Sequence, residues 1–347
     1  MRAFGFDARP EVGGFSDALQ VFELDRPAPG RDEVRVRVRA TSINVDDIHI
    51  IEGTFVGGAP VGPKPSPKRV AIPGHDFSGV VDAIGEGVDI PVGTEVYGLY
   101  DAFEGSGPWA DFVVVPVSRL STIPSGVTFE EAAAAPMSGT TALCAVDRSG
   151  VGEGQTCLVV GASGGVGSLC VQALASLGVE VWGVCSTPNV ELVRSLGASV
   201  VIDYKERPLA ETLRDRGVRF ACALDFVGGR ELERSVVPYV DRSGRFVTVV
   251  GPVAHVGDTR LGAWGLARMV GYIGRRVLGS RLRGPRYHFA VIGEPDFQRI
   301  ERLIFEQGKR AMIDRVLPLE LDAVREGVAH VLSHRARGRV VLSASQD

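Results

Sequence analysis

The stretch CLVVGASGGVGSLCVQALASLG, residues 157–178, decides the fold of this chain. An apolar run typical of a buried strand leads into a glycine-rich turn, and a helical segment rich in alanine and leucine follows. The turn ASGGVG is a GxGxxG pattern whose first glycine is alanine, which predicts a dinucleotide site, although small residues can also serve packing alone. The residues expected to contact the pyrophosphate are Ser163, Gly164, Gly165 and Val166.

Strand and helix signals alternate after this turn. Alternation of this kind indicates a doubly wound parallel sheet of the Rossmann type. The expected strands are residues 156–161, 179–185, 200–202, 220–226, 245–250 and 287–292, with helices at 166–177 and 189–196.

The first third of the chain is different. VRVRVRA, residues 34–40, alternates apolar and charged side chains, as a half-buried strand does. Further β-rich pieces at 77–84, 92–99 and 110–115 are separated by glycine and proline, which favours a compact, partly open β-barrel. The chain is therefore predicted to be an α/β protein. Two helices, 296–306 and 321–333, and a strand, GRVVLSA, are expected in the tail.

The second strand indicates which dinucleotide is bound. NAD sites usually carry an acid about 20 residues after the glycines, but here that position is Ser186, followed by Thr187. Hydroxyls can donate to a 2′-phosphate, whereas a carboxylate would repel it. Tyr204 and Lys205, after the next strand, add a ring and a positive charge. These residues favour NADPH over NADH; alternatively, Ser186 and Thr187 only cap the following helix.

Composition excludes several other classes. The 347 residues are enough for two domains, and the net charge of −4 gives no support for nucleic-acid binding. No apolar run approaches the roughly 18 residues of a membrane span. The five cysteines are scattered and lie mostly in apolar segments, which favours buried thiols in the reduced cytoplasm.

Several further segments carry a family resemblance: ATSINVDD (40–47), IPGHDFSGVV (72–81), GTEVYGL (93–99), GPWADFVVV (107–115), SGTTAL (138–143) and ARGRVVL (336–342). Together with GASGGVG they resemble the medium-chain dehydrogenase/reductase superfamily, and its zinc-free quinone oxidoreductase branch in particular. The resemblance implies a GroES-like catalytic domain from residues 1–127 and 297–347 and a Rossmann domain from residues 128–296. It also implies an active-site cleft between the domains and a homodimer.

The zinc-dependent branch of that superfamily holds its catalytic metal with a cysteine, a histidine and a second cysteine. At the matching positions this chain has Asn44, His75 and a residue near Pro136. One histidine cannot supply the three ligands of a catalytic zinc, and residues 101–109 lack the cysteines of the structural zinc lobe. No metal is therefore expected, and His75 is expected to be a hydrogen-bonded residue of a turn.

The resemblance also implies roles for particular residues. Asn44 and Asp47 would face the nicotinamide, unless they only form a turn and cap a short helix. His49 stands where zinc alcohol dehydrogenases often carry a proton-relay histidine; it can also be an ordinary surface histidine or contact the ribose. Phe55 replaces a tyrosine of some members and favours an apolar pocket, and Asn189 replaces a lysine of several NADPH-using members. Thr141, Val249, Val250 and Phe289 are expected near the nicotinamide and its ribose, with core packing as the alternative.

Without a metal, hydride transfer from NADPH to an electron-poor acceptor fits best. Quinones and α,β-unsaturated carbonyls move charge onto an oxygen that needs only hydrogen-bond donors. The proline-rich loop 56–71 and the segment 260–286 are expected to shape the rim of the cleft. The alternatives are an NADPH-binding sensor or assembly partner without turnover, and a zinc alcohol dehydrogenase.

Overall fold

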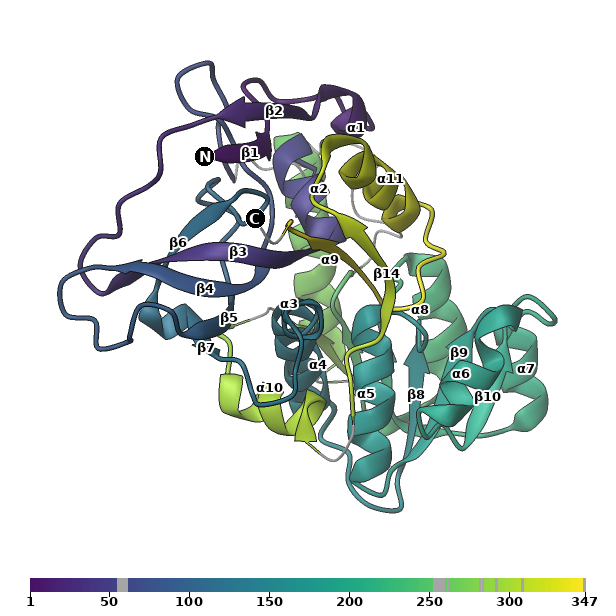
Figure 1. The fold of residues 1–347 in the computed structure, drawn as a ribbon. Helices are drawn as coiled ribbons and strands as arrows, with labels where there is room; N and C mark the ends of the chain where they lie inside the picture. The colour runs from purple at the N-terminus through teal and green to yellow at the C-terminus, as the bar shows by residue number, and fades with distance from the viewer. Residues whose placement is uncertain are drawn as a thin grey trace. The chain divides into compact units, whose positions relative to one another are not determined.

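The chain forms two compact units (Figure 1). The computed structural model describes residues 1–345 except 55–61, 252–259, 261, 281, 283, 291–292 and 307–308. Unit 1 comprises Met1–Met137, Gly257–Gly262 and Glu294–Asp347, so both ends of the chain contribute to it. Unit 2 comprises Ser138–Val256 and Ala263–Gly293.

Unit 1 is the β-rich unit that the first third of the sequence predicted. A small two-stranded sheet pairs β1 with β2, and a seven-stranded sheet has the order β14-β15-β3-β4-β5-β7, with β6 also paired to β3. Its strands are β1 (Arg2–Gly5), β2 (Gln20–Glu23), β3 (Glu33–Ile43), β4 (Asp76–Ile84), β5 (Glu95–Leu99), β6 (Phe112–Pro116), β7 (Leu120–Thr122), β14 (Ile313–Pro318) and β15 (Arg339–Ser343). Its helices are α1 (Phe15–Ala18), α2 (Val45–Glu52), α3 (Phe129–Ala133), α10 (Phe297–Ile304), α11 (Leu321–Leu332) and the 3-10 turn Val117–Arg119.

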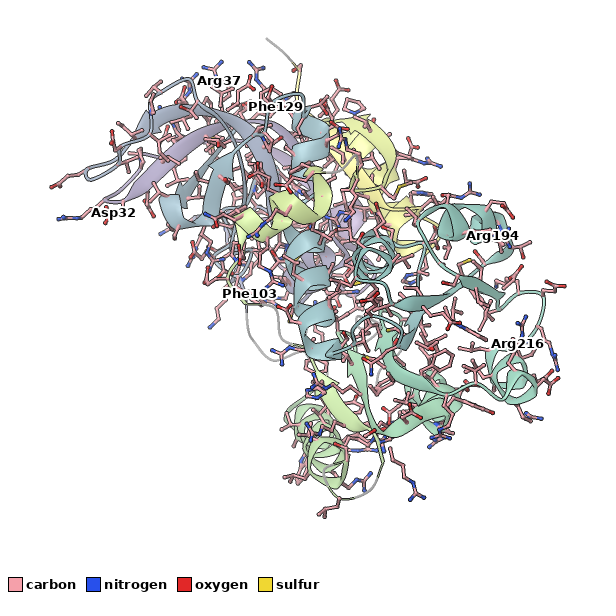
Figure 2. The ribbon with its side chains drawn as sticks, turned by 90° about the horizontal axis from the view of Figure 1, so that it is seen from below. Asp32, Arg37, Phe103, Phe129, Arg194 and Arg216 are labelled. Carbon is pink, nitrogen blue, oxygen red and sulfur yellow. The ribbon has the colours of Figure 1, made fainter. Side chains whose placement is uncertain are left out.

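Strand β3 shows why this unit folds as it does. Its valines, Val34, Val36 and Val38, are buried in one core cluster, and the alternating arginines point the other way. The turn that leads into β3 carries Asp32 at its tip, and Arg37 lies on the exposed side of the strand (Figure 2). The period-two pattern therefore predicted both the strand and its buried face.

Unit 2 contains a six-stranded sheet in the order β10-β9-β8-β11-β12-β13, and every neighbouring pair is parallel. Its strands are β8 (Thr156–Val160), β9 (Glu180–Cys185), β10 (Val200–Asp203), β11 (Phe220–Asp225), β12 (Val240–Thr248) and β13 (Arg286–Phe289). Its helices are α4 (Pro136–Ser149), α5 (Gly165–Ser176), α6 (Val190–Ser195), α7 (Leu209–Arg216), α8 (Arg230–Val236) and α9 (Ala263–Ser280), with 3-10 turns at Thr187–Asn189 and Val237–Tyr239.

This strand order is that of a doubly wound Rossmann sheet, as the sequence predicted. The order in which strands are added to the sheet reverses between β8 and β11: β9 and β10 lie on one side of this pair, and β12 and β13 on the other. Such sheets bind ligands at this point. Because all six strands are parallel, their carboxyl ends meet at one edge, and the segments that follow β8, β9, β10, β12 and β13 gather there.

The structure corrects some of the expected elements. Helices α7, α8 and α9 were not predicted, and β12 ends at Thr248 rather than at Val250. The Thr248 Oγ1 accepts hydrogen bonds from the N–H groups of Val250 and Gly251, at 3.3 and 2.9 Å, and so turns the chain out of the sheet. The expected strand 287–292 is observed as Arg286–Phe289, and residues 291–292 lie outside the described part of the chain.

All five cysteines are free thiols, and four of them are buried, in agreement with the sequence prediction. Burial raises the pKa of Cys170 and Cys222 well above the ordinary value, which keeps both thiols protonated and unreactive. In the described part of the chain, no helix is both long enough and apolar enough to cross a membrane.

Candidate active site

The glycine turn of unit 2 has the geometry of a phosphate cradle. Gly164 is the N-cap of α5, so the first N–H groups of this helix are free of intrahelical partners. A Cβ placed on Gly164 would meet only the carbonyl oxygen of Gly161, at 3.4 Å, so the space beside it is open. A Cβ on Gly167 would lie 2.1 Å from the same oxygen, which shows that this glycine lets α5 pack against β8. Ser163, Gly165 and Val166, also expected at the phosphates, flank Gly164 in the turn and first residues of α5.

Three polar side chains meet beside this turn. The Asn189 Nδ2 donates to the Oγ of Ser163, at 3.1 Å, and to the Oγ of Ser186, at 3.2 Å. Asn189 is 7% exposed, and its Oδ1 has no hydrogen-bond partner among the described residues. Because each serine oxygen accepts from Asn189, each serine hydroxyl keeps its own proton to donate elsewhere. The structure thus brings together the turn after β8 and the segment after β9, with an orphaned buried acceptor between them.

The segment after β10 lies next to this cluster. Cys185 and Asp203 are paired across β9 and β10, and the N–H of Tyr204 donates to the carbonyl of Cys185. Tyr204 is 46% exposed, and the Lys205 Nζ lies 5.2 Å from the centre of its ring. Tyr204 and Lys205 therefore stand at the edge where the sequence expected them.

The tertiary structure also places an acid at this edge, which counting along the sequence did not find. Hydrogen bonds from the Thr187 side chain and from backbone N–H groups, including that of Lys205, lower the pKa of Asp203. The carboxylate thus carries its negative charge at this edge while it accepts hydrogen bonds from within the protein. Thr187, expected as a second hydroxyl for a 2′-phosphate, is bonded to this acid instead.

The ends of β11, β12 and β13 form the other half of the edge. Asp225 is paired with Thr248 across β11 and β12, and Thr248 with Phe289 across β12 and β13. The Asp225 Oδ1 accepts from the N–H groups of Val227 and Gly228, at 3.0 and 2.8 Å. Burial raises the pKa of Asp225, although these bonds oppose the shift. Val249 and Val250 are half-buried in the bend after β12, beside Phe289, the ring of which lies against Gly251, while Thr141 is buried in α4.

In unit 1, the expected catalytic residues lie at the start of α2. Asn44 is the N-cap, and Asp47 occupies the third helical position, where its Oδ2 accepts from the Asn44 N–H at 2.7 Å. Asp47 therefore completes a capping box, and the N-cap role considered for it belongs to Asn44. Both side chains are buried, at 1% exposure for Asp47 and 4% for Asn44.

A buried arginine ties this helix start to two strands. Arg339 of β15 places its Nη2 2.6 Å from the Asn44 Oδ1 and 2.6 Å from the Oδ2 of Asp76, the first residue of β4. Asp76 also accepts from the Ser42 hydroxyl at 2.5 Å and, through its Oδ1, from the Met137 N–H at 2.6 Å. Asp76 is fully buried, so the charge of Arg339 is what makes its ionised form tolerable.

His75 joins the same network. Its Nδ1 is hydrogen-bonded to the Asp47 Oδ1, and the ring is 6% exposed, in the bend that precedes β4. Burial by itself lowers the pKa of His75, but the charges of Asp47, Asp46 and Asp76 outweigh burial and raise that pKa. The expectation of a hydrogen-bonded histidine in a turn is confirmed. The pKa of Asp46 is raised, chiefly by burial.

His49 lies one turn further along α2. Its Nδ1 is 3.1 Å from the Oγ1 of Thr54, and the backbone N–H of Thr54 donates to the His49 carbonyl. The ring is 8% exposed, so it is not a surface histidine. Phe55, expected to line the substrate pocket, lies outside the described residues.

Arg339 was not predicted as a site residue, although it lies in the motif ARGRVVL. A basic residue inside an otherwise apolar strand is the signal that could have found it, because a buried charge needs a partner. Asp225 could have been found in the same way, as an acid at the end of the apolar run FACALD.

Comparisons with known proteins agree with this architecture. The family model described as alcohol dehydrogenase GroES-like domain matches residues 30–125, and that described as zinc-binding dehydrogenase matches residues 196–342. The chain is 31% identical over 331 residues to the human mitochondrial NAD(P)H oxidoreductase RTN4IP1, covering 90% of this chain and 82% of that protein. It is 29% identical to the trans-enoyl reductase pgmF of Aspergillus terreus, covering 91% and 88%.

Among solved structures, the quinone oxidoreductase from Coxiella burnetii superposes with a TM-score of 0.80 at 23% identity, covering 99% of each chain. This likeness supports the fold of both units.

Proposed function

The chain belongs to the medium-chain dehydrogenase/reductase superfamily of NAD(P)H-dependent oxidoreductases, and from that premise we propose that it reduces a quinone or an α,β-unsaturated carbonyl with NADPH and without a metal. Bound NADPH would supply the hydride. The observation that carries the proposal is the cluster of Ser163, Asn189 and Ser186 beside the glycine turn, since it offers donors and an unsatisfied buried acceptor at the expected edge.

The preference for NADPH is argued from donors and charge. Ser163 and Ser186 accept from Asn189, so their hydroxyl protons are available to a 2′-phosphate. Lys205 adds a positive charge, and the Asp203 carboxylate at the end of β10 already accepts hydrogen bonds from Thr187 and from backbone N–H groups. Asn189 stands where several NADPH-using members of the family have a lysine. Its amide carries no charge, and it would contribute instead by orienting the two serine hydroxyls.

The roles of the other cofactor residues follow from their places at the carboxyl edge of the sheet. The turn with Gly164, Gly165 and Val166 would hold the pyrophosphate, and Tyr204 would border the adenosine. Val249, Val250, Phe289 and Thr141 would contact the nicotinamide half, where apolar walls exclude water from the reacting carbon.

Metal independence is argued from the donor set of unit 1. The Oδ1 of Asn44 accepts a hydrogen bond from the Arg339 guanidinium. A metal ion bound to the Asn44 Oδ1 would lie close to the Arg339 guanidinium, which is 2.6 Å from that oxygen, and the two positive charges would repel each other. Pro136, near the third ligand position of the zinc enzymes, offers no side-chain donor.

Asn44, Asp47 and His49 would therefore serve the acceptor rather than a metal. The Asn44 amide is held in one orientation, because its Oδ1 accepts from Arg339 at 2.6 Å and its Nδ2 donates to Asp76 at 3.0 Å and to Asp47 at 3.4 Å. Asn44 and Asp47 would therefore act by fixing the start of α2, and with it His49, beside the acceptor. His49, oriented by Thr54, is the proposed source of the proton. A homodimer and a cytoplasmic location are part of the same proposal.

The test is NADPH oxidation by the purified protein with a panel of benzoquinones, naphthoquinones and short enones, before and after dialysis against a chelator. We expect turnover with at least one acceptor class, no loss of rate on chelation and zinc far below one ion per chain. Activity that requires zinc would contradict the proposal. NADPH binding without oxidation across the panel would assign the chain a sensing or assembly role instead.

A further inference from the structure

Helix α9, Ala263–Ser280, presents an exposed stripe that the proposed reaction does not use. At about 100° per residue, Trp264, Arg268, Gly271, Arg275 and Leu278 lie within an arc of about 80°. We call these five residues the outer stripe. Trp264 is 85% exposed and Leu278 64%, and the remaining three residues are also exposed. Leu282, just beyond the end of the helix, is 86% exposed.

The opposite side of α9 is anchored to unit 2. The Tyr272 hydroxyl lies 3.1 Å from both carboxylate oxygens of Glu233, and the Arg276 Nη2 lies 2.6 Å from the Glu233 Oε1. Val277 packs against the core cluster of the parallel sheet, in which Tyr287 is buried. These anchors fix which side of the helix faces outward, so the exposure of the outer stripe is a property of the folded unit.

The outer stripe is open rather than filled by neighbouring side chains. A Cβ built on Gly271, or on Gly274 or Gly279, meets nothing within 4 Å. Trp264, Val270, Leu278 and Leu282 are all exposed within 19 consecutive positions, and a concentration of exposed apolar side chains marks an interaction surface.

The segment that contains α9 carries only positively charged side chains. Residues 263–293 contain no aspartate, glutamate or lysine, in a chain whose net charge is −4. The six arginines of the segment are Arg268, Arg275, Arg276, Arg281, Arg283 and Arg286. A basic, apolar face on an acidic protein is complementary to a surface that is both anionic and apolar.

We propose that α9 is a membrane-surface helix, which lies flat on a bilayer rich in anionic lipid with the outer stripe toward the lipid. The 18 residues of α9 span about 27 Å, too short and too charged to cross the bilayer but long enough to lie along it. Trp264 and Leu278 enter the headgroup boundary near opposite ends of the helix. Arg268 and Arg275 lie between them on the same face, where they meet lipid phosphates.

A second copy of the chain fits the outer stripe less well. In a two-fold contact the same patch faces itself, so Arg268 and Arg275 would face the arginines of the other copy with no acid in the segment to neutralise them. Like charges in contact oppose association, whereas lipid phosphates attract the same residues.

The experiment is co-sedimentation of the full-length protein with vesicles of phosphatidylcholine alone and of equimolar phosphatidylcholine and phosphatidylglycerol. We expect binding to the anionic vesicles only, weakened by salt because charges in water are screened over about 10 Å at 0.1 M ionic strength. Trp109 and Trp182 are buried, so a blue shift of tryptophan emission on binding reports the transfer of Trp264.

Two variants test the outer stripe separately. Arg268→Glu with Arg275→Glu removes its charge, and Trp264→Ser with Leu278→Ser removes its apolar surface. Each is expected to reduce the partition coefficient on anionic vesicles by more than about tenfold. Each arginine near the surface is worth about fivefold, and burial of one large apolar side chain is worth about tenfold or more. All of these side chains are exposed, so the melting temperature should stay that of the unmodified protein.

The matched control is Arg194→Glu with Arg214→Glu, the same change of charge on exposed residues of α6 and α7 in the same unit (Arg194 is labelled in Figure 2). It should bind vesicles within about twofold of the unmodified protein. Absence of binding at low salt, or equal losses in control and outer-stripe variants, would overturn the proposal. A dimer that dissociates in the outer-stripe variants, with no vesicle binding, would identify the stripe as a contact between copies instead.

Discussion

At the scale of single residues, the buried charge of Asp76 decides how α2 is held. Its carboxylate contacts Arg339, Ser42 and the Met137 N–H, and the same arginine reaches Asn44. One ion pair therefore joins β15, β4 and the N-terminus of α2, although Asp76 and Arg339 are 263 positions apart.

This ion pair supports a prediction about stability. Arg339→Met leaves the Asp76 carboxylate buried without its counter-charge, which typically costs about 3–5 kcal/mol of the free energy of unfolding. Urea denaturation measures the loss. Arg337→Met, two residues away and exposed, should change the free energy by less than about 0.5 kcal/mol. Equal effects of the two substitutions would mean that the pair does not hold this unit together.

His75 makes stability depend on pH. Its pKa in the folded protein is raised by Asp47, Asp46 and Asp76 in spite of burial, so folding favours the protonated ring. The resulting stabilisation is complete below the unfolded pKa of about 6.5 and is lost as pH rises through the folded pKa. Melting temperatures of the unmodified protein should therefore fall between neutral and alkaline pH.

The partner of His75 provides the control for this pH dependence. Asp47→Asn removes the largest favourable charge, so the fall in melting temperature with rising pH should become shallower. Asp89→Asn removes an exposed carboxylate of unit 1 and should leave the slope unchanged. If the slope is the same in all three proteins, another group is responsible for it.

At the scale of elements, the turn between β8 and α5 separates two uses of glycine. Gly167 allows the helix to approach the strand, because a Cβ there would lie 2.1 Å from the Gly161 carbonyl oxygen. Gly164 has only that oxygen at 3.4 Å and therefore tolerates a methyl group sterically. Gly167 is therefore needed for packing, and we infer that Gly164 is needed for ligand binding.

This difference gives a paired prediction. Gly167→Ala should lower the free energy of unfolding by roughly 1–3 kcal/mol, as overpacking does. Gly164→Ala should leave it within about 1 kcal/mol but weaken NADPH binding, since the methyl group occupies the space of the phosphate. Thermal unfolding and titration of NADPH fluorescence measure the two effects. Normal NADPH affinity of a folded Gly164→Ala protein would contradict a phosphate site at this turn.

Elements with strong periodicity were the predictable ones. Helix α5 was predicted to within one residue at each end, because helical spacing extends over the whole element. Strand β3 was predicted from its alternating part, and it continues three residues beyond the expected end, to Ile43, where consecutive residues are buried. Helix α9 was missed because it contains four glycines, each of which lowers helix propensity by about 1 kcal/mol. Tyr272 and Arg276 of this helix bind the Glu233 carboxylate, which comes close to them only when the chain folds. These contacts stabilise a helix that local propensity does not predict.

At the scale of the whole molecule, cofactor binding should stabilise the protein by linkage. A ligand that binds only the folded state adds about 2.7 kcal/mol at a hundred times its dissociation constant. We expect NADPH to raise the melting temperature more than NADH at equal concentration. The reason is the pair of serine hydroxyls oriented by Asn189, together with Lys205.

Asn189→Asp tests this preference with almost no change in shape. A carboxylate would accept hydrogen bonds from Ser163 and Ser186 instead of donating to them, and it would repel a 2′-phosphate. NADPH should lose its advantage while the stabilisation by NADH remains. An unchanged ratio of the two affinities would show that the cluster does not recognise the 2′ position.

The sequence by itself determined the class of fold and the turn at which we propose that the cofactor binds. The glycine turn, the alternation of strands and helices, and the family motifs are local patterns, and local backbone preferences and side-chain periodicity are enough to produce them. The family was inferred from the same motifs, and the comparisons confirm it.

Only the tertiary structure decided which polar groups meet. It paired Arg339 with Asp76 and Asn44, placed Asn189 between two serines, and brought Asp203 next to Thr187. The physical reason is that a buried polar group is stable only with a partner, and the partner is chosen by packing between segments far apart in the sequence.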